Sequence, residues 1–184
     1  MFKSWLVVCG LALCVANVRA EDGGGNRVGM FSHDAWTMDL TTAFTTDVSG
    51  DPQRLLTERI GISRGVTDRL VLSAELGGDV VTGKGQHGYG AGFNVRGRFE
   101  LARFGETSLF ADGAVGLRES DQRIPSEGTH FNFREEFGAG LFVPMGTEFG
   151  MIFGVHGEHI SNGGLGQNPG YNGLQGYLGL CWRV

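Results

Sequence analysis

A histidine and a serine two residues apart are the side chains of this sequence best suited to chemistry. They are His159 and Ser161, within the segment 149–162, FGMIFGVHGEHISN. Alternate residues of a β-strand share a face, with Cα atoms about 6.5–7 Å apart, so two such side chains can reach hydrogen-bond distance. An imidazole placed there can act as general base to the hydroxyl. The spacing therefore predicts a nucleophile, Ser161, and its base, His159, for acyl transfer.

A loop rich in glycine, asparagine and proline follows this pair, with the sequence GGLGQNPGYNG over residues 163–173. Such a loop can present backbone N–H groups together with the side-chain amides of Asn162 and Asn168. Donors of this kind stabilise the oxyanion of a tetrahedral intermediate. Asn172 has the same parity as Leu174, Leu178 and Leu180. We therefore expect it to lie on the same surface as His159, on the adjacent strand.

Strands must position these groups, because apolar residues recur with a period near two along most of the chain. The clearest case is 89–101, which has apolar residues on one face and Asn94, Arg96, Arg98 and Glu100 on the other. Similar alternation occurs over 69–76, 131–143, 149–161 and 177–184, and weaker alternation over 35–46, 53–64 and 107–119. These segments predict about eight strands.

An all-β fold, an eight-stranded antiparallel outer-membrane β-barrel over residues 35–184, explains this pattern best. The charged residues Arg96, Arg98 and Glu100 share one face, as in the packed lumen of a small barrel. A soluble β-sandwich or lipocalin-like barrel stays open as an alternative with the opposite polarity. In the membrane barrel the apolar companions of His159 place it on the lipid-facing exterior. With both termini on the periplasmic side, its strand ends at the outer rim.

The N-terminus indicates export. Residues 1–20 have a lysine, an apolar core and small residues before Ala20, which predicts a signal peptide cleaved near Ala20 and then a flexible segment over 21–34. Glycine supplies 33 of the 184 residues, which argues against a helical bundle. The formal net charge of -5 gives no basis for nucleic-acid binding. No Cys, His and Asp spacing suits a metal site, and no cofactor is expected.

The segment 159–165, HISNGGL, followed by Asn168-Pro169-Gly170, resembles the signature of outer-membrane lipid A 3-O-deacylases of the PagL type, often called acyloxyacyl hydrolases. The resemblance extends from about Phe131 to the C-terminus. It implies a barrel that hydrolyses the 3-position ester of lipid A, in lipopolysaccharide, without a metal. It also implies Ser161 as nucleophile, His159 as base, and oxyanion donors near Asn162, Gly164 and Asn168. The expected partners are lipopolysaccharide and outer-membrane lipid, and a homodimer is a further expectation.

The sequence departs from the family pattern at the acid. The glutamate that orients the family's histidine falls at Asn172, which can accept a hydrogen bond from the imidazole but brings no charge. Either the activity is weaker, or another carboxylate substitutes. Glu135 is the candidate, because it interrupts an apolar face that the turn at 144–146 brings alongside His159. The alternative function is a catalytically lapsed barrel with a structural or small-molecule-binding role.

Overall fold

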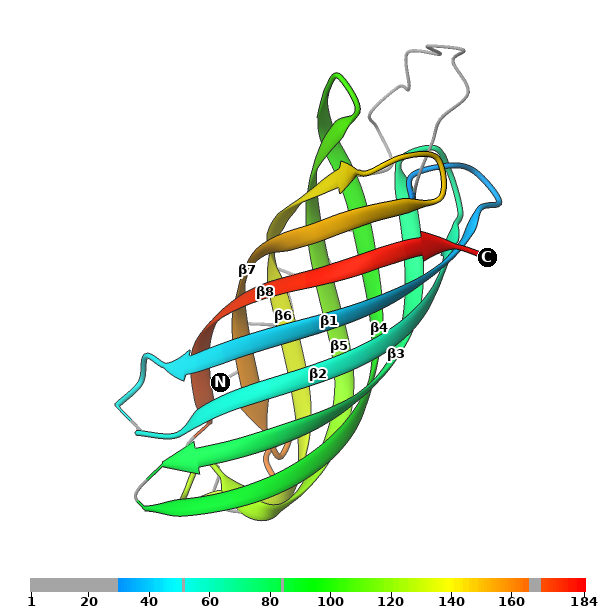
Figure 1. Cartoon of the computed structure of the whole chain (residues 1–184). Coiled ribbons are helices and arrows are strands. Elements are labelled where there is room, and N and C mark those ends of the chain that lie inside the picture. Colours follow the sequence, from blue (N-terminus) through cyan, green and yellow to red (C-terminus); the bar gives the residue numbers. More distant parts are fainter. Residues whose placement is uncertain (1–29, 51, 84, 166–169) are drawn as a thin grey trace.

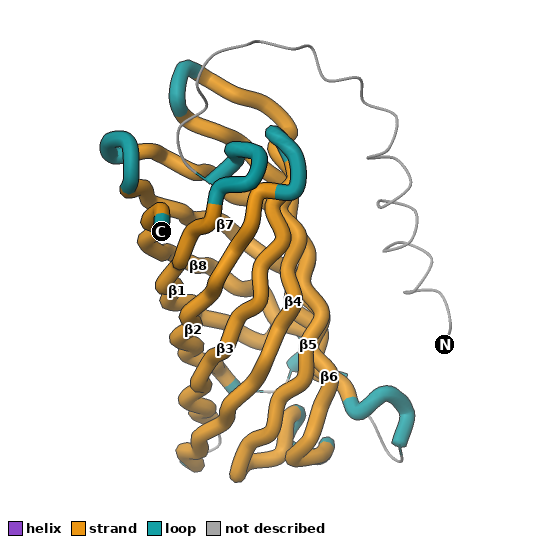
Figure 2. Tube along the Cα trace, turned by 90° about the vertical axis from the view of Figure 1, so that its right-hand side faces the viewer, coloured by secondary structure: helices purple, strands orange, loops and turns teal. Residues whose placement is uncertain are grey.

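The chain folds into one closed cylinder of antiparallel strands. The computed structural model describes residues 30–50, 52–83, 85–165 and 170–184. Its strands are β1 (Trp36–Asp47), β2 (Arg54–Gly65), β3 (Leu70–Gly83), β4 (Gln86–Phe104), β5 (Thr107–Ile124), β6 (Thr129–Pro144), β7 (Phe149–Ser161) and β8 (Tyr171–Arg183). Each pairs with its neighbours in sequence, and β1 closes on β8 (Figures 1 and 2). The predicted eight-stranded antiparallel barrel is confirmed.

Most strand positions agree with the alternation in the sequence, and β7 has the predicted bounds. The main difference is that β3, β4, β5 and β8 are longer than predicted. Their additional parts, such as GGDVVTG in β3 and SDQRI in β5, contain glycine or consecutive polar residues that hide the period of two. Pairing with neighbouring strands holds these parts extended, and their residues alternate between inward and outward positions although their polarity does not alternate.

The strands are strongly tilted, as Figure 1 shows. The stagger of the strands can be measured by stepping from His159 to its paired residue on each neighbouring strand in turn. One full circuit of the barrel ends at Phe149, which lies ten residues before His159 on β7. Such a stagger tilts the strands by about 40° from the barrel axis. Two ends can be distinguished. The terminal end carries the start of β1, the end of β8 and turns 66–69, 105–106 and 145–148; the loop end carries connections 48–53, 84–85, 125–128 and 162–170.

The exterior of the barrel is apolar. Outward positions on every strand carry exposed large apolar side chains, among them Leu40, Phe44, Leu56, Ile60, Leu72, Leu76, Phe93, Val95, Val115, Leu117, Phe133, Phe137, Phe153, Val155, Leu174 and Leu178. The inward positions are mostly polar or charged and buried. Both soluble alternatives require the opposite polarity and are therefore excluded. No helix of the described residues is long and apolar enough to cross a membrane.

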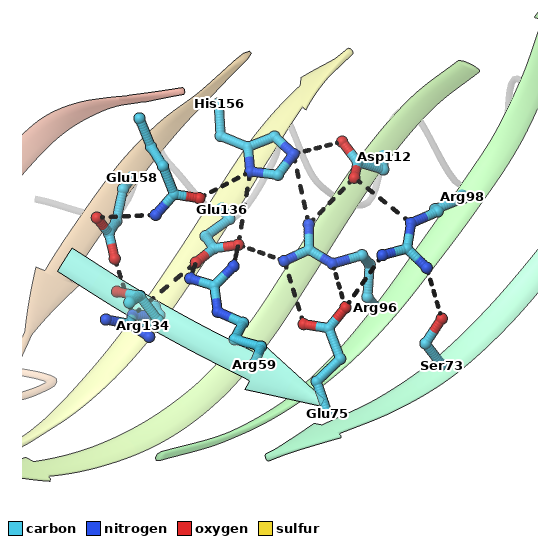
Figure 3. Close-up of polar contacts among 12 residues, drawn as sticks. Arg59, Ser73, Glu75, Arg96, Arg98, Asp112, Arg134, Glu136, His156 and Glu158 are labelled. Atoms are coloured by element: carbon cyan, nitrogen blue, oxygen red, sulfur yellow. Dashed lines mark hydrogen bonds and ion pairs between the residues drawn. The ribbon is translucent and has the colours of Figure 1, made fainter. Parts of the chain in front are cut away.

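Buried charges of opposite sign fill the middle of the lumen. One connected network, shown in part in Figure 3, joins Arg59, Arg96, Arg98, Arg118 and Arg134 to Asp39, Glu75, Asp79, Asp112, Glu136, Glu158 and His156. Its members come from seven of the eight strands. Buried charges are tolerated when they are paired and hydrogen-bonded, so the network makes a charged interior compatible with a closed barrel.

Apolar layers cover this network at both ends. At the loop end Leu55, Val81, Ile124, Ile160 and Tyr171 form one cluster. At the terminal end a second cluster includes Val71, Phe110, Phe142, Ile152 and Cys181. The lumen is therefore a packed core.

Two residues before β1 belong to the second cluster. Met30 and Phe31 are fully buried, and the Phe31 ring lies 5.9 Å from that of Phe110. They lie at the end of segment 21–34, for which the sequence predicts flexibility; residues 21–29 lie outside the described residues. Burial of two large apolar side chains in the barrel mouth holds the end of this segment in place.

Arg96 lies at the centre of the network. Its Nε is 2.7 Å from Glu75 on β3, its Nη1 is 3.1 Å from Asp112 on β5, and its Nη2 contacts Glu136 on β6. Replacing one partner of a buried ion pair leaves the other charge uncompensated, which costs about 3–5 kcal/mol.

We therefore expect Arg96→Met to lower the free energy of unfolding by about that amount. The measurement is urea unfolding in phospholipid vesicles, followed by tryptophan fluorescence. Arg64→Met is the control, because Arg64 pairs with Asp34 on the exposed surface, where ion pairs contribute little. Equal unfolding midpoints for the two variants would contradict the role given to the network.

Candidate active site

Three neighbouring strands bring the predicted catalytic side chains to one patch of the exterior. His159 and Ser161 lie at the end of β7, outward-facing and half-buried. In the strand register His159 is opposite Glu135 on β6 and Asn172 on β8. Both neighbours also occupy outward positions. Directly paired residues have Cα atoms about 4.5–5.5 Å apart, so Glu135 and Asn172 flank the histidine.

Asn172 orients the imidazole. His159 Nδ1 lies 2.8 Å from Asn172 Oδ1. A carboxamide oxygen only accepts hydrogen bonds, so the proton of a neutral imidazole is placed on Nδ1, which donates. Nε2 then carries the lone pair, as the base of a serine nucleophile requires. The asparagine thus fixes the tautomer and the ring direction without contributing charge.

Gly170 lies close to the imidazole ring and limits the space around it. It precedes β8 with φ +70°, a left-handed conformation that favours glycine. A Cβ at this position would lie 3.1 Å from His159 Cε1, tighter than ordinary contact. A side chain at position 170 would therefore press on the edge of the imidazole between its two nitrogens, and glycine leaves room for the ring. The sequence pattern does not predict this proximity, although the glycine after Pro169 is a recognisable turn signal.

The remaining contacts of the patch are looser. Within the described residues no hydrogen bond joins Ser161 Oγ to His159, or Glu135 to His159. Side chains that share a strand face or a register position can close such gaps by a change of rotamer. Hydrogen bonds at catalytic sites are often long without substrate. The arrangement therefore has the components of a Ser-His pair with its orienting residue in place.

The predicted oxyanion donors are used within the loop. Asn162 is buried; its Oδ1 accepts from the Gly164 N–H at 3.0 Å, and its Nδ2 donates to Leu165 O at 3.3 Å. These contacts shape the start of the connection between β7 and β8. Asn168 lies outside the described residues.

The second histidine of β7 does not belong to this patch. His156 points into the lumen, where its Nε2 lies 2.8 Å from Asp112 and its ring stacks on Tyr177. Among the described residues, no three His, Cys, Asp or Glu side chains are grouped so as to hold a metal ion.

Comparison with known proteins gives a family and a fold. The family model described as "Lipid A 3-O-deacylase (PagL)" matches residues 37–180. No curated protein matches the chain. Similar solved structures include the outer membrane enzyme PagL, with 21% identity, TM-score 0.53, and coverage of 79% of this chain and 99% of that chain.

Two further barrels are similar at lower identity. Neisserial surface protein A has 10% identity and TM-score 0.58, with 81% of this chain and 96% of that chain covered. The N-terminal barrel domain of Pseudomonas aeruginosa OprF has 15% identity and TM-score 0.50, with 80% and 97% covered. At these identities the likeness shows the fold.

The closeness of Gly170 to His159 can be tested without an activity assay. We expect Gly170→Ala to shift the NMR signals of the His159 Cε1–H group, because the new methyl group would press on that atom. Gly85→Ala is the matched control, since Gly85 has φ +72° and a Cβ there would meet nothing within 4 Å. A His159 signal that is the same in both variants would show that Gly170 does not limit the space around the ring.

Proposed function

The chain belongs to the lipid A 3-O-deacylase (PagL) family, and on that premise we propose that it hydrolyses an acyl ester of lipid A. Ser161 is the nucleophile and His159 is the base. The observation that carries this assignment is the His159–Asn172 hydrogen bond on the apolar exterior, with Ser161 two residues away on the same face. A hydrolase of lipid esters needs its catalytic groups on that surface, since a packed lumen admits no lipid.

The depth of the patch supports the same substrate. Short turns of outer-membrane barrels are periplasmic and longer loops lie outside. The connection 162–170 lies at the loop end, directly after Ser161. We therefore place the loop end outward, in the outer membrane, after removal of the signal peptide near Ala20. Ser161 and His159 then lie at the outer rim, beside the sugar and ester region of lipopolysaccharide.

The reaction proceeds in two steps. Ser161 Oγ attacks the ester carbonyl carbon while its proton passes to His159 Nε2, and donors of the β7–β8 loop stabilise the resulting oxyanion. Collapse breaks the bond to the sugar oxygen, which takes the proton from His159. Water then attacks the acyl-serine carbonyl carbon with His159 again as base. The bond to Ser161 Oγ breaks, Oγ takes the proton from His159, and the fatty acid leaves.

Asn162, Gly164 and Asn168 are the proposed oxyanion donors. Asn162 and Gly164 would exchange internal hydrogen bonds for bonds to the oxyanion. The Asn162 Nδ2 bond to Leu165 O is 3.3 Å long. Hydrogen bonds to a charged acceptor are roughly twice as strong as neutral ones, so this exchange is favourable in the transition state.

Glu135 supplies the charge that Asn172 lacks. When His159 takes the proton it becomes an imidazolium, which a nearby carboxylate stabilises. Glu135 is directly opposite His159 on β6 and half-buried beside Phe133 and Phe137, where a charge acts more strongly than in water. It acts through electrostatics, while Asn172 fixes the ring.

The alternative function is a lapsed barrel that keeps the fold for a structural or small-molecule-binding role. The neutral side chain of Asn172 is the observation that favours it. Mass spectrometry of lipid A from cells that express the protein separates the two functions.

We expect loss of one acyl group from lipid A with the wild-type chain, and a decrease of at least about 10³-fold in rate with Ser161→Ala. Ser49→Ala is the control, because this loop hydroxyl binds Asp47 at the same end of the barrel. Identical, fully acylated lipid A with the wild-type and Ser161→Ala chains would favour the lapsed barrel.

The division of roles between Asn172 and Glu135 gives a second prediction. In the serine-protease triad, replacing aspartate by asparagine lowers turnover about 10⁴-fold, so Asn172→Glu is expected to raise kcat at least about tenfold here. Glu135→Gln should lower kcat in the native chain and have a much smaller effect in the Asn172→Glu background. If the effects of Asn172→Glu and Glu135→Gln on the free energy of activation are additive in this double-mutant cycle, the carboxylate of Glu135 does not take the place of the missing acid at position 172.

A further inference from the structure

A second carboxylate lies on the apolar exterior, outside the catalytic patch. Glu58 is exposed on β2, with Leu56 and Ile60 as its outward neighbours along the strand. Ionisable side chains in an apolar, lipid-facing band are costly and rare, and they mark binding or transport sites. Glu58 is on β2, whereas the catalytic residues lie on β6, β7 and β8. It therefore needs an explanation of its own.

The surroundings of Glu58 leave it able to accept further hydrogen bonds. Thr42 Oγ1, on β1, lies 2.9 Å and 2.8 Å from its two carboxylate oxygens. A hydroxyl has a single proton to donate, so most of the acceptor capacity remains. On the other side Glu58 pairs with Gly78 on β3, where a Cβ would meet nothing closer than Gly90 O at 3.8 Å. The surface beside the carboxylate is thus open.

A cation lies on the same face as this carboxylate, nearer the loop end of the barrel. Arg54 is exposed, on the same face of β2 and four residues nearer the loop end. With a rise of about 3.3 Å per residue and a strand tilt of about 40°, it is about 10 Å higher along the barrel axis. The headgroup region of each leaflet is about 5–8 Å thick, so a spacing of about 10 Å extends from the headgroups into the upper part of the acyl chains.

We propose that this face of β1, β2 and β3 binds a phosphorylated glycolipid whose acyl chains carry hydroxyl or amide groups. Arg54 binds the phosphate, and Glu58 with Thr42 accepts an O–H or N–H from the upper part of a chain. The open surface at Gly78 lets that chain approach. The site is non-catalytic and holds a second lipid in addition to the substrate. This proposal rests on the proposed function for the orientation of the barrel, in which the loop end faces outward.

Charge complementarity favours the phosphorylated glycolipid over an ordinary phospholipid or a second copy of the chain as the ligand of this face. A phospholipid with unmodified acyl chains offers a phosphate to Arg54 but no donor to Glu58. A second copy whose two-fold axis passed beside Glu58 would bring this side chain against its own copy, and the two carboxylates would repel each other.

Native mass spectrometry of the full chain in micelles tests the proposal. The chain carries Ser161→Ala, so that no ligand is consumed and the result does not depend on catalysis. The probes are a synthetic phosphorylated glucosamine disaccharide with hydroxyacyl chains and, for comparison, phosphatidylglycerol. We expect Glu58→Leu combined with Thr42→Val to weaken one glycolipid site at least tenfold and to leave phosphatidylglycerol binding unchanged. Ile62→Leu, an apolar change further down the same strand, is the control.

Folding is checked separately by the gel mobility of heated and unheated samples. The doubly substituted chain is expected to unfold at a higher temperature in phosphatidylcholine micelles, because a charge has left the apolar band. Equal glycolipid binding by the doubly substituted and control chains would overturn the proposal. A wild-type dimer that the double substitution dissociates would overturn it too, since the occupant would then be a second copy. A chain with the native Ser161 that binds the glycolipid but releases no fatty acid from it would instead count against the proposed function alone.

Discussion

Each strand of this barrel presents its alternate side chains to two different surroundings, an apolar exterior and a closed lumen. A slip of one residue in β4 would turn Arg96 and Arg98 outward and bring Phe93 and Val95 inside. The paired charges of the lumen oppose such a slip, because Arg96 bonds to carboxylates on three other strands. The ion network therefore fixes the register as well as neutralising the core.

The same alternation gives the two histidines of β7 different roles. His156 faces inward, bonds to Asp112 and stacks on Tyr177, so it belongs to the core. His159, three residues later, faces outward and bonds to Asn172. The packed side chains of the lumen fix the register of β6, β7 and β8. Glu135 and Asn172 are therefore held on either side of His159. A rigid scaffold of this kind can orient the proposed catalytic base mainly from residues on neighbouring strands.

The sequence was sufficient to predict the barrel, the strand that carries His159 and Ser161, and the position of Glu135, because these follow from a period of two and short turns. The position of Asn172, beyond the long loop, was predicted from its parity with Leu174 and from the family resemblance. It could not predict that Met30 and Phe31 close the lumen, since two apolar residues beside a glycine-rich stretch carry no periodicity. The burial of Asn162 and the closeness of Gly170 to His159 depend on loop geometry. Such geometry is set by three-dimensional packing.

The central claim is that Ser161 is an activated nucleophile on the lipid-facing surface. The most direct measurement is covalent labelling of the folded protein by a long-chain fluorophosphonate, with the modified residue located by peptide mass spectrometry. This account predicts labelling at Ser161 that is lost in His159→Ala, because an unactivated serine does not react. No labelling of the native chain, or labelling of Ser161 that persists without His159, would contradict it.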